Sequence, residues 1–249
     1  MALNAIIFQR CVIIGPNAYA TLLFLYQIFA GPVMTNQGYW IVGAGGLARG
    51  AVEALATSGT RVAGLVTAHR EDVSWFNGVV IPEVDFLARS SADLAVIAVG
   101  DNALRESIVE RYATVRSSVT WVHVIDKSAM ISPTARIGGG AIILAGAIVA
   151  AQAVVGRHAL IYSGCVIEHD CTIGDFASFG PAAALGGEVT IGRGSFIGLG
   201  ARVGHGRSIG MDSVVGMGSV VTGDLPDSVV AYGTPCRAVR SRRKGDRYL

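Results

Sequence analysis

Charged and aromatic side chains are scarce in this sequence of 249 residues. Charged residues make up 15% of it and aromatic residues 7%, whereas 51% of the residues are hydrophobic. This composition excludes an intrinsically disordered chain and provides enough apolar side chains for one large domain or two ordinary ones. The net charge of +2 at pH 7 is too small to indicate a nucleic-acid partner.

In the second half of the chain, the hydrophobic residues recur neither with the period of a helix nor in simple alternation. They recur at every sixth position instead. An aliphatic residue, or in one case Phe, stands at every sixth position from Ile131 to Val221. A small residue precedes it by two positions in all hexads except those with Val189 and Arg207. This pattern predicts a β-solenoid whose coils consist of three short strands and lie roughly 4.8 Å apart. Every third hexad adds a glycine directly after the aliphatic residue, which sets the length of one coil: Gly138, Gly156, Gly174, Gly192 and Gly210.

Cysteine pairs with the spacing of a metal site or a redox motif are also lacking. The four cysteines, Cys11, Cys165, Cys171 and Cys236, include no CxxC. Cys165 and Cys171 occupy the small inward position of consecutive hexads, where cysteine acts as a small hydrophobic residue. We therefore expect reduced, structural thiols and a cytoplasmic protein.

Residues 1–36 form an N-terminal extension with an apolar stretch from Cys11 to Val33. Such a stretch is compatible with a signal peptide or a membrane-associated helix. The segment that follows, however, predicts a cytoplasmic nucleotide fold, and Met34 directly precedes its first strand. We favour translation from Met34, so that membrane contact is expected only if residues 1–33 are real.

Residues 37–125 predict a small, doubly wound α/β domain of the Rossmann-like type. A buried strand, Tyr39–Val42, runs into a glycine-rich turn, Gly43–Gly46, and then into a helix that ends near Thr57. The backbone N–H groups of such a turn and the positive end of the helix dipole form a cradle for phosphate. Two further strands are expected at residues 61–66 and 94–99. The second of them ends in Gly100-Asp101-Asn102, and a helix is expected after it at residues 104–111.

The acidic residue that an NAD site needs after its second strand is missing. That residue holds the ribose, but here the strand ends in Val66-Thr67-Ala68 and the first acid is Glu71. The pattern Gly43-x-Gly45-x-x-Ala48 is weak evidence by itself. We therefore favour a different nucleotide or a nucleotide-sugar phosphate, with a purely structural turn as the alternative.

Among the five histidines, His169 has the setting of a general base. It lies in the string Glu168-His169-Asp170, at an expected corner of the solenoid with its side chain directed outward. The flanking carboxylates can orient the ring and raise its basicity. The alternative is an ordinary charged, solvated corner.

His205 follows His169 by two coils, so the two are expected on the same corner, roughly 10 Å apart. This pair raises the question of a zinc lyase, which needs three histidines. Gly210 occupies the place where a further histidine beside His205 is expected. We therefore predict no metal.

Basic residues gather at the end of the chain, where residues 240–249 form a basic tail. The tail is either solvated or attracts a phosphorylated cofactor or an anionic surface. The basic residues concerned are Arg237, Arg240, Arg242, Arg243, Lys244 and Arg247.

The sequence resembles the sugar O-acyltransferase family, which includes sialic acid O-acetyltransferases and bacterial nucleotide-4-amino-sugar N-acetyltransferases. The resemblance covers about residues 37–239 and implies a left-handed parallel β-helix at residues 126–239, after the Rossmann-like domain. The matching segments are Ile41–Gly46, Ala98–Asn102 with Arg105, Ile125–Ala129, Ser132–Ala135, His169–Cys171 and Tyr232–Arg237.

The resemblance implies a homotrimer that binds acetyl-CoA between adjacent subunits and transfers its acetyl group directly to a sugar. His169 would be the catalytic base, and Asp170 would raise its basicity. The residues implied to contact the cofactor are Ser178, Gly187, Gly198, Gly200 and Arg237. Those implied to bind the nucleotide-linked sugar are Gly43, Gly45, Gly46, Gly100 and Asn102.

The sequence also departs from the family. Leu47 stands where many members have histidine, Ser178 where some have a cofactor-facing histidine, and Thr67-Ala68 replaces the acid that reads the nucleotide. We expect acetylation of the 4-amino group of a nucleotide-linked sugar, for bacterial surface glycans. The alternatives are a sialic acid or other sugar O-acetyltransferase, a non-catalytic trimeric nucleotide-sugar-binding protein, and a zinc lyase of the carbonic anhydrase type.

Overall fold

The computed structural model describes residues 37–68 and 73–246. Residues 37–249 belong to one compact unit, separate from residues 1–36. The interpretations of the N-terminal extension therefore lie outside the described residues, as do Cys11, Glu71 and Arg247. Within the described part, no helix has both the length and the apolar character needed to cross a membrane.

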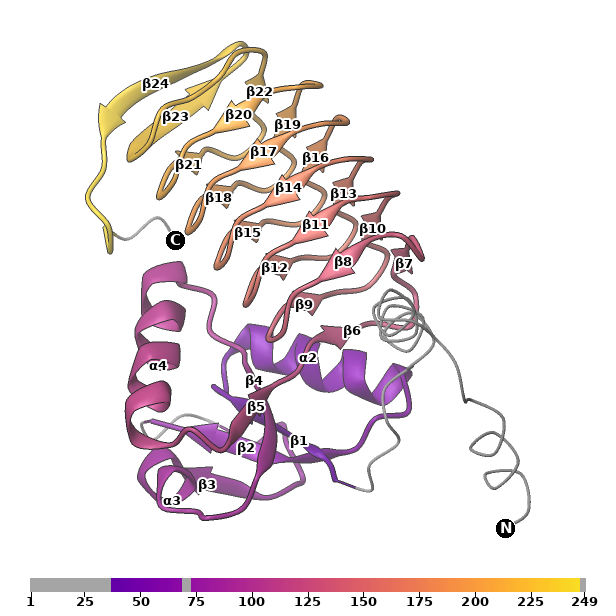
Figure 1. Cartoon of the computed structure of the whole chain (residues 1–249), viewed down its shortest axis with the longest axis vertical. Helices are drawn as coiled ribbons and strands as arrows, with labels where there is room; N and C mark the ends of the chain where they lie inside the picture. Colours follow the sequence, from indigo (N-terminus) through magenta and orange to yellow (C-terminus); the bar gives the residue numbers. More distant parts are fainter. Residues whose placement is uncertain (1–36, 69–72, 247–249) are drawn as a thin grey trace, which may run out of the picture. The chain divides into compact units, whose positions relative to one another are not determined.

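The chain first builds a five-stranded parallel sheet in the order β3-β2-β1-β4-β5 (Figure 1). Side chains alternate across β1, so Ile41 faces α2 while Trp40 and Val42 face α3 and α4. The predicted α/β domain is thus present. Its elements are β1 (Tyr39–Val42), α2 (Gly46–Thr57), β2 (Val62–Thr67), β3 (Val80–Pro82), α3 (Glu83–Leu87), β4 (Asp93–Ile97), α4 (Asn102–Val115) and β5 (Val119–Trp121).

A left-handed β-helix follows, and its short strands form three sheets (Figure 1). The strands are parallel except for the last strand of sheet III, which pairs antiparallel with its neighbour. Sheet I contains β7 (Met130–Ile131), β10 (Ile148–Val149), β13 (Val166–Ile167), β16 (Ala184–Leu185), β19 (Arg202–Val203) and β22 (Val220–Val221). Sheet II contains β8 (Arg136–Ile137), β11 (Val154–Val155), β14 (Thr172–Ile173), β17 (Thr190–Ile191) and β20 (Ser208–Ile209). Sheet III contains β6 (Val124–Ile125), β9 (Ile142–Ile143), β12 (Leu160–Ile161), β15 (Ser178–Phe179), β18 (Phe196–Ile197), β21 (Val214–Val215), β23 (Val229–Gly233) and β24 (Cys236–Ser241).

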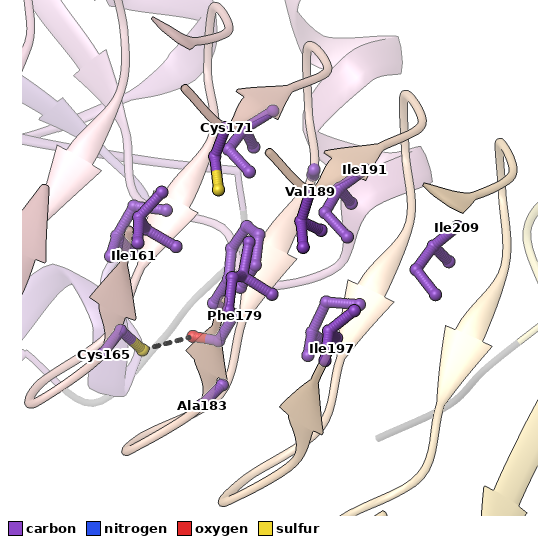
Figure 2. Close-up of a cluster of buried hydrophobic side chains, with 14 of the residues drawn as sticks. Ile161, Cys165, Cys171, Phe179, Ala183, Val189, Ile191, Ile197 and Ile209 are labelled. Atoms are coloured by element: carbon purple, nitrogen blue, oxygen red, sulfur yellow. Dashed lines mark hydrogen bonds between the residues drawn. The ribbon is translucent and has the colours of Figure 1, made fainter. Parts of the chain in front are cut away.

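The register of these sheets confirms the 18-residue coil. In sheet I, for example, Ile148 pairs with Val166 and Val149 with Ile167. The aliphatic residue of each hexad points inward and stacks on its equivalent in the next coil, as Ile161, Phe179 and Ile197 do in Figure 2. Burying one such side chain is worth roughly 1.5–3 kcal/mol, so the repeated layers stabilise the β-helix along its length.

Cys165 and Cys171 fill the small inward positions of their hexads, as expected. Cys165, Cys171 and Cys236 are buried and form no disulfide. The thiol of Cys165 lies 3.8 Å from the carbonyl oxygen of Phe179, the contact drawn in Figure 2. Burial raises the pKa of the Cys165 thiol to about 11, which makes it unreactive.

Three edges join the sheets, and each has its own character. Edge I/II consists of the turns between sheets I and II and carries His169. Edge II/III carries His158 and Phe176, which are both buried. Edge III/I carries Pro181 and Leu199, and Leu199 is exposed.

The predicted start of the β-helix, residue 126, directly follows β6, and its predicted end, residue 239, lies inside β24. Strand β6 ends at Ile125 and pairs with β9 in sheet III, so the first β-helix strand precedes residue 126. Strand β24 continues to Ser241, and Arg242 is buried, with Nη1 donating to the carbonyl of Asp212 at 2.7 Å. The start of the expected basic tail is therefore packed against the β-helix.

Candidate active site

His169 stands on edge I/II, in the turn between β13 and β14, with half of its side chain exposed. The turn holds Asp170 at a positive φ of 59°, and the Oδ2 atom of Asp170 lies 2.8 Å from Nδ1 of His169. This hydrogen bond, with the negative charges of Asp170, Glu168 and Glu188, raises the pKa of His169. When Nδ1 donates to the carboxylate, Nε2 keeps the lone pair that can accept a proton.

Gly187 lies one coil further along the same edge and leaves room for the His169 ring. A Cβ atom at position 187 would stand 2.5 Å from both Cε1 and Nε2 of His169. His205, one coil beyond, has its ring centroid 6.3 Å from that of His169. This is shorter than the roughly 10 Å expected from two coils, because the rings lean toward each other across the bare glycine.

The other residues implied to contact the cofactor lie elsewhere on the β-helix. Gly198 and Gly200 belong to the turn between β18 and β19 on edge III/I, a different edge from His169. Arg237 is exposed on the hairpin β23–β24. It lines a cavity of about 430 Å³ together with Leu225, Pro226 and Cys236.

The glycine-rich turn lies at the centre of the α/β sheet, where the strand order reverses. Strand β1 has β2 on one side and β4 on the other, and ligands of open α/β sheets bind at the carboxyl ends of strands at such a reversal. Gly43, with φ of 115°, approaches the neighbouring loop so closely that a Cβ atom would lie 2.8 Å from the carbonyl oxygen of Ala98. Gly45 and Gly46 are exposed, and nothing lies within 4 Å of a Cβ atom built on either. The space above this turn is open to a ligand.

Arg49 adds a positive charge beside this turn, although no sequence motif predicts it. It lies in the first turn of α2, and its guanidinium carbon is 5.3 Å from the ring centroid of Trp75. The first turn of α2 contains no acidic residue. A cation stacked in this place can pair with a diphosphate held by the glycine-rich turn.

Ser178 and Asn102 are both buried between helix α4 and the β-helix. They are 1% and 3% exposed, and the Ser178 hydroxyl donates to Oδ1 of Asn102 at 2.6 Å. Helix α4 covers this part of sheet III, so both side chains bond to each other and to Arg105. The hydrogen bonds that the structure shows for these two side chains are therefore internal, and the ligand contacts implied for them stay a prediction. Gly100 stays at the tip of β4, where its carbonyl accepts from Nη1 of Arg105 at 3.2 Å.

The described residues contain no group of three or more His, Cys, Asp or Glu side chains able to hold a metal ion. On edge I/II the nearest carboxylate to His205 is that of Glu188, with 3.8 Å between Nε2 and Oε1. His169 is itself engaged with Asp170.

Comparisons with known proteins place the chain. Residues 40–112 match the family model of the PglD N-terminal domain. A comparison with curated protein sequences finds no match. Among solved structures, the perosamine N-acetyltransferase of Caulobacter crescentus is similar over 83% of this chain and 99% of its own, with 35% identity and a TM-score of 0.76. That structure is of a histidine-to-asparagine variant in complex with coenzyme A and GDP-perosamine.

The acetyltransferase domain of PglB from Neisseria gonorrhoeae, solved with acetyl coenzyme A, is also similar. It shares 28% identity, covers 82% of this chain and 100% of its own, and has a TM-score of 0.75. WeeI from Acinetobacter baumannii, at 22% identity, shares the fold.

The left-handed β-helix and the α/β domain before it define an acyltransferase of the hexapeptide-repeat superfamily. Within this superfamily, the chain belongs to the bacterial sugar acetyltransferases, because it matches nearly the whole perosamine enzyme at 35% identity.

Proposed function

We propose that the protein transfers the acetyl group of acetyl-CoA to the 4-amino group of a nucleotide-linked amino sugar, with His169 as general base. The observation that carries this proposal is the pair of His169 and Asp170 on an exposed edge of the β-helix. The carboxylate orients the ring and raises its pKa, while Nε2 points over the bare Gly187.

The reaction follows from this geometry as a direct transfer. The amine nitrogen of the sugar attacks the thioester carbonyl, and Nε2 of His169 accepts a proton from that nitrogen. The carbon–sulfur bond then breaks, and the coenzyme A sulfur leaves and takes up a proton. Asp170 stabilises the imidazolium that forms, which is the usual role of a carboxylate behind a histidine base. The thiols of Cys165, Cys171 and Cys236 take no part in this step, because they are buried.

The two relatives support both substrates. The perosamine enzyme was solved with coenzyme A and GDP-perosamine, and the PglB domain with acetyl coenzyme A. We assign the nucleotide sugar to the turn Gly43–Gly46, with Arg49 beside it and the Gly100 loop as the opposite wall. At 35% identity to the perosamine enzyme, a GDP-linked sugar is the first candidate. For acetyl-CoA we assign edge I/II around Gly187 and, for its phosphates, the exposed Arg237.

We further propose a homotrimer in which acetyl-CoA binds between adjacent β-helices. The two parts of the site favour an assembly, because Gly198 and Gly200 lie on a different edge from His169 and one cofactor can touch both edges only across a subunit boundary. We place the enzyme in the cytoplasm, where acetyl-CoA and nucleotide sugars are made, and assign its product to surface-glycan synthesis. Light scattering of the purified protein measures the subunit number.

The deciding experiment is release of thiol from acetyl-CoA with a panel of acceptors. The panel contains 4-amino sugars linked to GDP, dTDP and UDP, together with free sialic acid, and a reaction without acceptor is the control. We expect release with one amino sugar, and a product heavier by one acetyl group on nitrogen. Release with sialic acid alone would establish an O-acetyltransferase instead. Absence of release from the whole panel would contradict the proposal and favour a binding protein.

A further inference from the structure

One face of helix α4 is buried against edge II/III of the β-helix and carries polar residues. Asn102, Arg105 and Glu106, spaced to lie on one side of the helix, are 3%, 0% and 4% exposed. Nδ2 of Asn102 donates to the carbonyl oxygens of Gly194 and Ser195, at 2.9 and 3.2 Å. Polar groups are rarely buried to this extent unless their hydrogen bonds have a defined role.

The guanidinium of Arg105 joins two parts of the chain that are far apart in sequence. On one side, Nη1 donates to the carbonyl oxygen of Val99 at 2.7 Å and to that of Gly100. On the other side, Nε donates to the carbonyl of His158 and Nη2 to the carbonyl of Phe176, both at 2.9 Å.

Each end of this connection lies beside one half of the proposed site. The Val99–Asp101 loop follows β4 and borders the glycine-rich turn, since a Cβ atom at Gly43 would stand 3.4 Å from Cγ2 of Val99. His169 lies in the turn before β14, and Phe176 lies in the turn after it, so the two residues belong to the same coil. Arg105 therefore lies between the loop that borders the nucleotide sugar and the coil that carries the base.

We propose that Arg105 is a positioning residue, which holds the Val99–Asp101 loop in its binding-competent place relative to the coil of His169. This inference rests on the proposed function of the site. The planar guanidinium suits the role, because its N–H groups point in fixed directions and can hold carbonyls on two sides at once. If the loop is loosened, only a fraction of molecules presents it correctly, and the apparent affinity for the nucleotide sugar falls by that fraction.

Two variants weaken the connection to different degrees. Arg105→Lys keeps the positive charge but loses the planar fork. Ser178→Ala is milder, because it removes the hydroxyl that accepts from Nη2 of Arg105 at 3.0 Å and leaves every backbone acceptor in place. Ser213→Ala is the matched control. Its hydroxyl is equally buried but bonds to the carbonyl of Pro226 at 2.8 Å, within the β-helix.

Hydrogen–deuterium exchange of the ligand-free protein tests the proposal directly. We expect the amides of the Val99–Asp101 loop to exchange faster in Arg105→Lys and, to a smaller extent, in Ser178→Ala, and to be unchanged in Ser213→Ala. In steady-state assays with GDP-perosamine, we expect the KM for the sugar to rise about 3- to 10-fold, while the KM for acetyl-CoA stays the same.

A merely structural role for Arg105 predicts a different result. The melting temperature would then fall in all three variants, while loop exchange and the ratio of the two KM values would match the wild type, and this outcome would overturn the proposal. If the wild-type protein acetylates no sugar, the proposed function fails separately. The exchange measurement needs no substrate and still decides whether Arg105 holds the loop.

Discussion

Two histidines of the same β-helix, His158 and His169, have opposite surroundings. His158 is 3% exposed, stacks on Phe176 with 5.1 Å between ring centroids, and meets Trp121 edge-on. Burial, with the charges of Arg105 and Arg157, lowers its pKa to about 4. His169 is half exposed, and the hydrogen bond between its Nδ1 and the accepting carboxylate of Asp170 raises its pKa.

The two histidines share one feature of the repeat, although His158 stands at the turn position of Asp170, with φ of 56° against 59°, and His169 stands one position earlier. Each ring lies over a glycine at the equivalent place of a neighbouring coil, Gly140 for His158 and Gly187 for His169. What differs is the cover, because α4 and the end of the α/β domain pack on edge II/III, whereas edge I/II is open. The comparison teaches that the hexad period determines where a side chain projects, and that the neighbouring elements determine its ionisation.

The largest expected effect is on catalysis, from His169→Ala. Loss of the general base should lower kcat by about 10²- to 10⁴-fold, measured as thiol release with the acceptor found in the panel. His205→Ala is the matched control on the same edge, and we expect a smaller loss because Glu188, at 3.8 Å from Nε2 of His205, is too far away to hydrogen-bond to it. Turnover of His169→Ala close to the wild-type value would show that His169 is not the general base. The proposed functional difference between edge I/II and edge II/III would then be lost.

The second effect is on stability, from His158→Phe. The replaced ring can keep its stacking, because Phe176 occupies the equivalent turn position at a similar positive φ, 60° against 56°. The pKa of His158 is lowered in the folded state, so the unfolded chain binds a proton that the folded protein excludes as the pH falls from 6.5 toward 4. The wild type should therefore lose about 2 kcal/mol of stability by pH 5 through this residue.

Urea denaturation at pH 7.5 and at pH 5 measures this effect. We expect the free energy of unfolding of the wild type to fall more than that of His158→Phe between pH 7.5 and pH 5. At the lower pH the variant should therefore be as stable as the wild type or more stable. All other titrating groups contribute equally to both proteins and cancel in the difference. A constant difference at the two pH values would show that His158 is not excluded from protonation in the fold.

The β-helix could be predicted from the sequence almost completely. The inward position of the aliphatic residues follows from the period alone, and the coil length follows from the third-hexad glycines. The structure adds the reason for those glycines, since a Cβ atom at Gly174 would stand 2.5 Å from the backbone nitrogen of Arg193 in the next coil. A repeat of this kind depends on contacts between equivalent residues, which the sequence displays directly.

The site could be predicted only in part. The His169–Asp170 pair is local, and adjacent residues reveal it. The burial of Ser178 and Asn102 depends instead on how α4 packs on sheet III, a contact between residues 76 positions apart. Their outward or loop positions in the sequence pattern gave no sign of this cover, so the sequence alone did not predict that both side chains are buried.

A smaller effect on catalysis, and the sharpest test of the open edge, comes from Asp170→Asn. Asparagine tolerates the positive φ of 59° at this position, so the turn should form as before. The carboxylate of Asp170 raises the pKa of His169 by stabilising the imidazolium. Its loss should lower that pKa, so that the acid limb of the kcat/KM profile moves to lower pH while the plateau falls about tenfold because the base is weaker.

Glu188→Gln separates the hydrogen bond from simple charge. Glu188 also raises the pKa of His169, but it acts through its charge alone and contributes least of the carboxylates around the ring. We expect its removal to move the acid limb in the same direction by a smaller amount, with the plateau preserved. Equal shifts in the two variants would mean that the whole acidic edge, rather than the contact between Asp170 and Nδ1, sets the basicity of His169. Asp170 would then be one charge among several, and His169 and Asp170 would not act as a specific hydrogen-bonded pair.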